Sequence, residues 1–163
     1  MKIPLTLNSK KVVLSAEPTD TLLNVLRREH LYSVKCGCEN GICGNCMVLL
    51  DDTSVPSCKI PMGIIRDSNI ITLEHFKNDP LYQDIVTGFS QAGIHMCGYC
   101  NAGKIFTAYS ILKKYYRPTI EQIHTAIKNL NSCCTDYTTF TNGILYAIAA
   151  KHTREGKKTN AKK

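Results

Sequence analysis

Alternating positions at the start of the chain predict a β-hairpin. Ile3, Leu5 and Leu7 alternate with residues that are not strongly apolar, as expected of a strand with one buried face. Residues 8–10 are polar and form a turn signal, and residues 11–15 have the pattern of a returning strand. This segment therefore predicts two antiparallel strands.

The spacing of apolar positions changes to a helical period after the hairpin. The apolar residues between 22 and 26 lie on one side of a helix, which Thr19 or Asp20 can cap and which ends near His30. Later strands, separated from the helix by a cysteine-rich loop, are expected over 47–50 and 70–73. The first half therefore predicts a small mixed sheet packed on one helix.

The second half has the periodicity of helices. Pro80 suits the first position of a helix, and Thr119 and Gln122 have the spacing of a capping box at the start of another. The four expected helices cover residues 81–91, 102–116, 119–130 and 138–152. No strand pattern recurs here, so the chain as a whole is predicted to be an α+β fold that ends in a four-helix unit.

Composition narrows the class of protein. The 163 residues, 44% of them hydrophobic, suit one or two small globular domains. No run of about 18 apolar residues predicts a membrane span, and the first ten residues lack the apolar core of a secretory signal. These features predict a cytoplasmic protein, where thiols stay reduced. Nine cysteines then favour metal ligation over disulfides.

The net charge of +7 is concentrated at the C-terminal end. Residues 154–163 hold five Lys or Arg residues and one Glu. A basic tail can bind nucleic acid or anionic lipid, but no aromatic-basic nucleic-acid motif accompanies it. We therefore expect a disordered, solubilising basic tail over 153–163, with no nucleic-acid or membrane partner.

The strongest chemical signal is a cysteine-rich loop. Cys38, Cys43 and Cys46 have the spacing C-x4-C-x2-C, and Cys58 follows after eleven intervening residues. This spacing is typical of plant-type [2Fe–2S] ferredoxins. Two glycines in the loop can adopt positive φ angles and leave room for backbone N–H groups to point at a cluster. Disulfides and zinc are the alternatives, but zinc loops favour paired C-x2-C motifs or histidines. With the strand and helix pattern, the loop predicts a β-grasp ferredoxin domain.

Four more cysteines fall in the gaps between the predicted helices. Cys97 and Cys100 lie between the first and second helix, and Cys133 and Cys134 lie between the third and fourth. Two loops at one end of a bundle can bring four thiolates together. A C-x2-C pair alone is shared by zinc and redox sites, but beside a ferredoxin loop in the same chain it predicts a second cluster.

Taken together, these motifs resemble the small iron–sulfur subunit of molybdenum hydroxylases of the xanthine dehydrogenase type, over about residues 1–150. Besides the cysteine loop, the matching stretches are Val34–Cys38, Ser57-Cys58, Ile71–Glu74, Cys97–Cys100 and the run up to Tyr137. The resemblance implies a β-grasp [2Fe–2S] domain over 1–76 and a four-helix [2Fe–2S] domain over 77–152.

The resemblance also implies a function and partners. We expect an electron-transfer subunit with no catalytic residue of its own, which relays electrons through two [2Fe–2S] clusters. The expected partners are a large subunit that binds the molybdenum cofactor and a medium subunit that binds FAD.

Ligands follow from the resemblance residue by residue. The cluster nearer the flavin would be held by Cys38, Cys43, Cys46 and Cys58. The cluster nearer molybdenum would be held by Cys97, Cys100 and Cys134, together with a fourth ligand.

This fourth ligand is open between two residues. The family usually ends with Cys-Arg-Cys-Thr-Gly-Tyr, where this chain has Ser132-Cys133-Cys134-Thr135-Asp136-Tyr137. Alignment on Thr135 and Tyr137 places Ser132 where the first cysteine belongs. Either Cys133 binds through a shifted backbone or Ser132 supplies an oxygen. Thiolate is the softer ligand and the normal one for such clusters, which favours Cys133.

Other departures from the family pattern gather in the same half. Met96 stands where the family usually has a Gln that contacts the pterin, and Asn101–Gly103 replace Thr-Pro-Gly. His95 lies near the C-x2-C motif and could tune a cluster or replace a ligand, as histidines do in Rieske centres. Cys36 has no place in the ligand pattern, and we expect it not to bind iron.

Two other functions remain open on the residues. A stand-alone ferredoxin-like carrier would shuttle between diffusing partners, although such carriers are usually acidic on their docking faces and this chain is basic. A zinc-stabilised interaction module would use the same cysteines without redox chemistry. No Ser/His/Asp arrangement or phosphate-binding glycine loop stands out.

Overall fold

The predicted hairpin forms one side of a five-stranded mixed sheet in the computed structural model, which describes residues 1–130 and 134–160. Strands β1 (Lys2–Leu7) and β2 (Lys10–Ser15) pair antiparallel. The other strands are β3 (Met47–Leu50), β4 (Thr53–Pro56) and β5 (Asn69–Ile71). The order across the sheet is β2-β1-β5-β3-β4, and only β1 and β5 run parallel.

Two turns shape the far side of this sheet. Asp51 and Asp52 connect β3 to β4, and both have positive φ angles, as the tight turns of β-hairpins require. The last strand is shorter than predicted, because the N–H of Thr72 donates to Oδ1 of Asn8 at 2.9 Å and the chain then enters α2 (Leu73–Phe76). Two short 3-10 helices precede β5, namely η1 (Ser57–Lys59) and η2 (Met62–Ile64).

Helix α1 (Leu22–Arg28) packs on the sheet and contributes four buried side chains to the first hydrophobic core. Its cap is Thr21, whose side chain accepts from the N–H of Asn24 at 3.3 Å, and not Thr19 or Asp20 as the sequence predicts. The buried side chains that meet here include Ile3, Leu5, Leu7, Leu22, Leu23 and Leu26. The apolar positions that the alternating and helical patterns predict to be buried are therefore buried in the structure.

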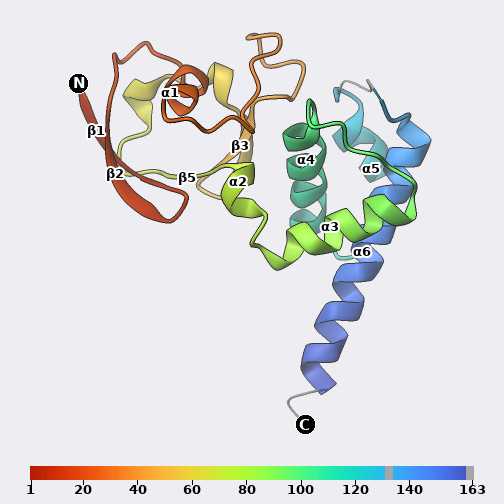
Figure 1. Ribbon diagram of the computed structural model, residues 1–163. Helices are drawn as coiled ribbons and strands as arrows, with labels where there is room; N and C mark the ends of the chain where they lie inside the picture. Colours follow the sequence, from red (N-terminus) through yellow and green to blue (C-terminus); the bar gives the residue numbers. More distant parts are fainter. Residues whose placement is uncertain (131–133, 161–163) are drawn as a thin grey trace.

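The helical half contains α3 (Pro80–Gln91), α4 (Asn101–Lys114), α5 (Ile120–Ile127) and α6 (Tyr137–Asn160). The side chain of Asp79 caps α3, and the predicted capping box of Thr119 and Gln122 is present at α5. The helices lie beside the sheet unit (Figure 1), which confirms the α+β class. No helix within the described ranges is both long enough and apolar enough to cross a membrane.

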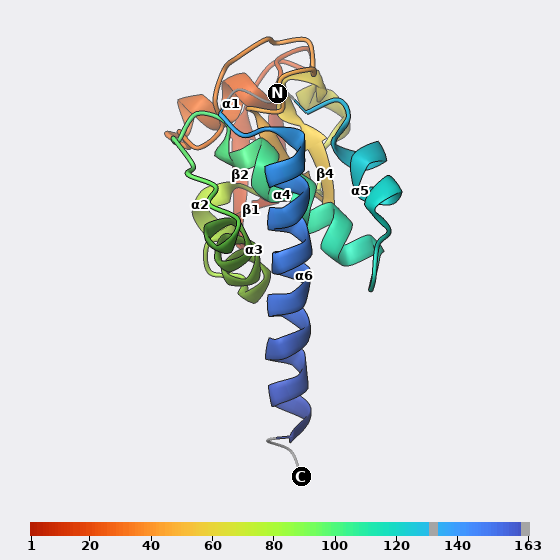
Figure 2. The same ribbon diagram turned by 90° about the vertical axis from the view of Figure 1, so that its right-hand side faces the viewer.

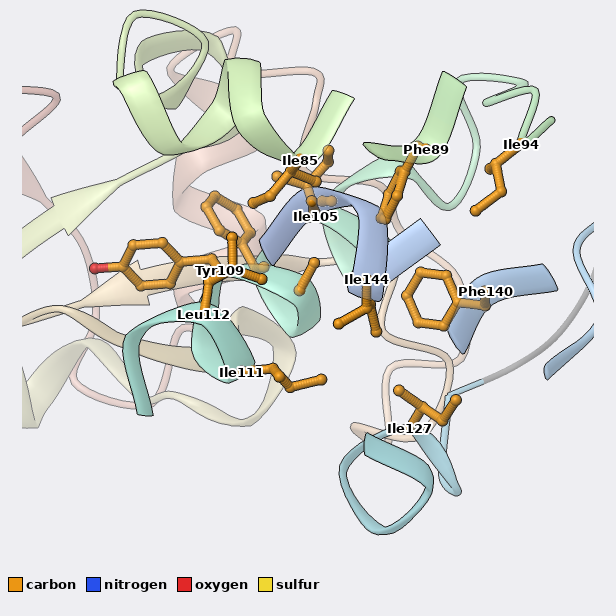
Figure 3. Packing of buried hydrophobic residues seen from close by; sticks show 14 of the residues in the cluster. Ile85, Phe89, Ile94, Ile105, Tyr109, Ile111, Leu112, Ile127, Phe140 and Ile144 are labelled. Carbon is orange, nitrogen blue, oxygen red and sulfur yellow. The ribbon is translucent and has the colours of Figure 1, made fainter. Parts of the chain in front are cut away.

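A second hydrophobic core lies between the helices (Figure 3). Phe89 of α3, Ile105 of α4 and Ile144 of α6 contribute to it, and all three side chains are buried. Helices α3 and α6 touch through their backbones, since a Cβ atom on Gly88 would lie 2.2 Å from the nitrogen of Ala147. Leu73 and Phe76 of α2 also pack in this core.

Helix α6 is longer than the sequence predicts. A disordered tail is expected from residue 153, but α6 continues as a helix through Asn160 and extends well beyond the other helices (Figure 2). The guanidinium of Arg154 donates from Nε and an Nη atom to the carboxylate of buried Asp84 on α3, at 3.0 and 2.7 Å to Oδ2. This ion pair holds the helix past the predicted end of the domain.

Candidate metal centres

Backbone N–H groups of the first cysteine loop point at sulfur atoms. The N–H of Cys43 donates to Sγ of Cys38 at 3.2 Å, and the N–H of Cys38 donates to Sγ of Cys43 at 3.4 Å. Ile42 and Asn45 add further N–H donors to the same two sulfurs. The backbone bond from Cys43 is the main reason why the pKa of Cys38 falls to about 6. The loop therefore stabilises negative charge on sulfur.

Glycines allow this loop to close around its sulfurs. Gly41 and Gly44 have φ angles of 85° and 73°, as the sequence predicts. Gly37 contributes in a way that the sequence analysis missed, because a Cβ atom at this position would lie 2.7 Å from Sγ of Cys43. Its lack of a side chain permits the close approach of that thiol to the backbone.

Cys46 and Cys58 form the inner pair of the first site, and both are buried. The carbonyl of Cys46 accepts hydrogen bonds from the N–H and the hydroxyl of Ser57, which fixes the residue before Cys58. Burial and the neighbouring Cys46 raise the pKa of Cys58 to about 12. A buried thiol with such a raised pKa loses its proton readily only to a metal ion, which compensates the thiolate charge.

Two residues of this loop region, Asn45 and Cys36, are not candidate ligands but have defined contacts of their own. Asn45 is buried, with 4% of its surface exposed, although its polarity suggests an exposed loop position. Its carbonyl accepts from the N–H of Lys35, and its backbone N–H donates to Cys43. The thiol of Cys36 donates to the Glu39 carboxylate at 2.9 Å, and this bond raises the pKa of Cys36.

The second set of cysteines meets at the N-terminal end of α4. The sulfurs of Cys97, Cys100 and Cys134 all lie within 4.8 Å of one another. Cys100 is the N-cap residue of α4, where the helix dipole favours negative charge. The loop before it is held by Gly98, which has a φ angle of 89° and donates its N–H to Oδ1 of Asn101. Cys133 and Ser132, the two candidates for the fourth ligand, lie outside the described residues.

A lysine that the sequence analysis did not single out is also part of this site. Lys104 follows Cys100 by one helical turn, so the two side chains share a face of α4. Its Nζ donates to Sγ of Cys134 and to Oγ1 of Thr135, both at 2.9 Å. Burial favours the neutral amine, but the sulfurs of Cys134 and Cys100 outweigh burial and raise the pKa of Lys104.

The two candidate sites are joined by a backbone contact. A Cβ atom on Gly103 of α4 would lie 2.7 Å from the carbonyl oxygen of Gly44, so these two glycines touch. Gly44 lies between Cys43 and Cys46, and Gly103 lies three residues after Cys100. The loop over 35–45, drawn in orange, and the start of α4 accordingly lie at the same end of the molecule (Figure 1).

Known proteins match the chain over both sites. Residues 5–69 match a family model described as "2Fe-2S iron-sulfur cluster binding domain", and residues 72–145 match "[2Fe-2S] binding domain". The nicotinate dehydrogenase small FeS subunit of Eubacterium barkeri is 37% identical over 90% of this chain and 94% of its own length. The xanthine dehydrogenase iron-sulfur-binding subunit of Escherichia coli O157:H7 is 32% identical over 88% and 91%. The chain belongs to the small iron–sulfur subunits of the molybdenum hydroxylase family.

The fold of this family extends over both halves of the described chain. The structure of quinoline 2-oxidoreductase from Pseudomonas putida 86 matches with a TM-score of 0.81 and 30% identity, over 93% of this chain and 96% of the other. The protein is therefore an electron-transfer subunit of an oxidoreductase complex, as the sequence predicts. Each of its two halves corresponds to a [2Fe–2S]-binding domain.

The departures from the usual family pattern lie around the second site. Met96 is half-buried against the helical core. The carbonyl of His95 faces Sγ of Cys134 at 4.0 Å, whereas its imidazole is not among the ligand atoms that converge there in the described part of the chain.

Proposed function

We propose that Cys38, Cys43, Cys46 and Cys58 hold one [2Fe–2S] cluster. The observation that carries this proposal is their division into two pairs. Cys38 and Cys43 are linked by reciprocal N–H···S bonds, and Cys46 lies beside Cys58 in the interior. Two irons that each need two thiolates fit this arrangement, and the backbone donors fit the negative charge of the bound sulfurs.

A second [2Fe–2S] cluster is proposed at the start of α4. Cys97, Cys100 and Cys134 would hold it, with Cys133 as the fourth ligand in preference to Ser132. The converging sulfurs and the cation of Lys104 fit a negatively charged group. The domains that carry the two clusters are proposed to cover 1–76 and 77–152.

The chain would act as a relay between two partners. We propose that it receives electrons from a subunit with a molybdenum cofactor and passes them to a subunit with FAD. A [2Fe–2S] cluster, when bound, takes up and gives up one electron at a time. The residues hold the sulfurs, limit access of water to the buried ligands, and bring the two sites together through the contact of Gly44 and Gly103.

Metal and sulfide analysis with EPR of the reduced complex tests the cluster assignment. We expect iron and acid-labile sulfide in equal amounts, a red-brown colour and two distinct [2Fe–2S] signals. A colourless protein that contains zinc would show that the cysteines hold a structural metal instead.

Copurification from the native cells tests the relay. We expect subunits with molybdenum and FAD to copurify with this chain, and the chain alone to have no hydroxylase activity. A chain that purifies alone and exchanges electrons with diffusing partners would instead be a stand-alone carrier.

The names of the relatives also lead us to propose an N-heteroaromatic substrate for the complex. Turnover of aldehydes without turnover of nicotinate, xanthine or quinoline would contradict this.

A further inference from the structure

A buried ammonium lies against the candidate ligand sulfurs of the second site. The side chain of Lys104 is almost fully buried, with 2% of the residue exposed. Its Nζ donates to Sγ of Cys134 and to the hydroxyl of Thr135, both at 2.9 Å. Cys100 lies one turn earlier on the same side of α4, and Cys134 lies three residues before α6, so the Lys104 side chain extends toward cysteines of two different segments.

Such a cation needs compensation. Removal of an ammonium from water is costly unless acceptors and opposite charge replace the water. No carboxylate of the described residues forms an ion pair with Lys104, so the available partners are the sulfurs of Cys134 and Cys100 and the hydroxyl of Thr135. The buried ammonium of Lys104 therefore favours negative charge on the neighbouring sulfurs.

The first site has no equivalent within the described residues. The sulfurs of Cys38 and Cys43 accept hydrogen bonds from neutral backbone N–H groups, and no lysine or arginine of the described residues donates to them. The two sites thus differ in the kind of donor that reaches their ligands, with dipoles at one and a full positive charge at the other.

We propose that Lys104 is a fixed cation that raises the reduction potential of the second cluster. The lysine thereby makes this cluster a better electron acceptor than it would be without the positive charge. This inference rests on the proposed second cluster. When the cluster accepts one electron, its overall charge becomes more negative by one. A cation in contact with a ligand sulfur therefore stabilises the reduced form more than the oxidised form. In the working complex the electron comes from the partner that oxidises the substrate.

An EPR-monitored redox titration of the purified complex tests this role. We compare Lys104→Met and Lys104→Gln, which remove the charge, with Lys104→Arg, which keeps it. In the neutral variants we expect the equilibrium constant for reduction of the second cluster to fall at least tenfold, a shift of about 59 mV for one electron. The first cluster should shift less. Lys113→Met removes one positive charge from an exposed position on the same helix and should leave both potentials unchanged.

The possible outcomes either support or overturn the proposed effect of Lys104 on the potential. An unchanged second potential in both neutral variants overturns the proposal, as does an equal shift in Lys113→Met. If the second cluster is lost from the neutral variants but retained in Lys104→Arg, the positive charge is required at the sulfurs, as proposed. Loss of the second cluster in all three variants would show that the site depends on the shape of the lysine side chain and not on its charge, which would overturn the proposal. A wild-type complex with no second signal would refute the proposed cluster itself, and this inference with it.

Discussion

Single residues divide the first site into two chemically different halves. Backbone donors lower the pKa of Cys38, whereas burial raises that of Cys58. The Cys38 thiol is therefore ready to bind metal near neutral pH, and the Cys58 thiol depends on the metal to lose its proton. Cys36 belongs to neither half, because its thiol is engaged by Glu39.

Replacement of one outer ligand should remove one cluster only. In Cys43→Ser the harder oxygen replaces a thiolate that receives two backbone N–H bonds. We expect EPR of the reduced complex to lose or strongly change the signal of the first cluster, while the helical half stays folded by circular dichroism. Cys36→Ser is the matched control and should leave both signals intact. Two unchanged signals in Cys43→Ser would refute the ligand assignment.

At the scale of secondary-structure elements, local patterns predict what local contacts determine. The hairpin, α1 and the capping box of α5 follow from residues that are close in sequence. The length of α6 does not, because its basic end looks like a solvated tail until Asp84 of α3 is placed beside Arg154. The role of Lys104 was hidden for the same reason, since Cys134 reaches it from thirty residues away.

The ion pair between α3 and α6 should contribute strongly to stability. Arg154→Met leaves the Asp84 carboxylate buried without its partner, which we expect to cost about 3 kcal/mol in the free energy of unfolding. Denaturant unfolding followed by circular dichroism measures this. Lys157→Met, at an exposed position one turn later, should change stability by less than about 0.5 kcal/mol. Equal effects of the two substitutions would show that the pair is not what holds α6.

A carboxylate at α2 should make stability depend on pH. Glu74 accepts from the N–H and hydroxyl of Ser33 and from the hydroxyl of Thr72. Partial shielding from water alone would raise its pKa, but these bonds outweigh that shielding and lower the pKa. A lowered pKa means that the stabilisation is present above the unfolded pKa, about 4.3, and is lost as pH falls through the lower folded value.

We therefore expect Glu74→Gln to unfold at a lower temperature than the wild type at pH 7, by an amount that corresponds to less than about 1 kcal/mol because Glu74 is exposed. The difference should shrink as pH falls below 4. Thermal unfolding from pH 3 to 7 measures it, with the exposed Glu17→Gln as control. A difference that grows toward acid pH would mean that the sign is reversed.

At the scale of the whole molecule, the packing of two units decides how close the two sites lie. The sequence predicts both units and the cysteines of each, because spacing within a loop encodes a local ligand set. It does not predict that Gly44 and Gly103 touch, since that contact depends on how β3 and α4 pack against each other. The approach of the two cysteine loops is therefore a property of the tertiary structure.

A methyl group at this contact should separate the two sites. In Gly103→Ala the added Cβ would lie 2.7 Å from the carbonyl oxygen of Gly44 and 3.1 Å from its carbon, and backbone atoms cannot rotate away. We expect a loss of about 1–3 kcal/mol of stability, as for other overpacked positions. The magnetic interaction between the two reduced clusters in EPR should also weaken.

Gly156→Ala is the matched control, because open space surrounds that position in α6, and it should stabilise the helix by up to about 1 kcal/mol. An unchanged interaction with unchanged stability in Gly103→Ala would mean that the loops are free to move apart, and that the glycine contact does not set the distance between the sites.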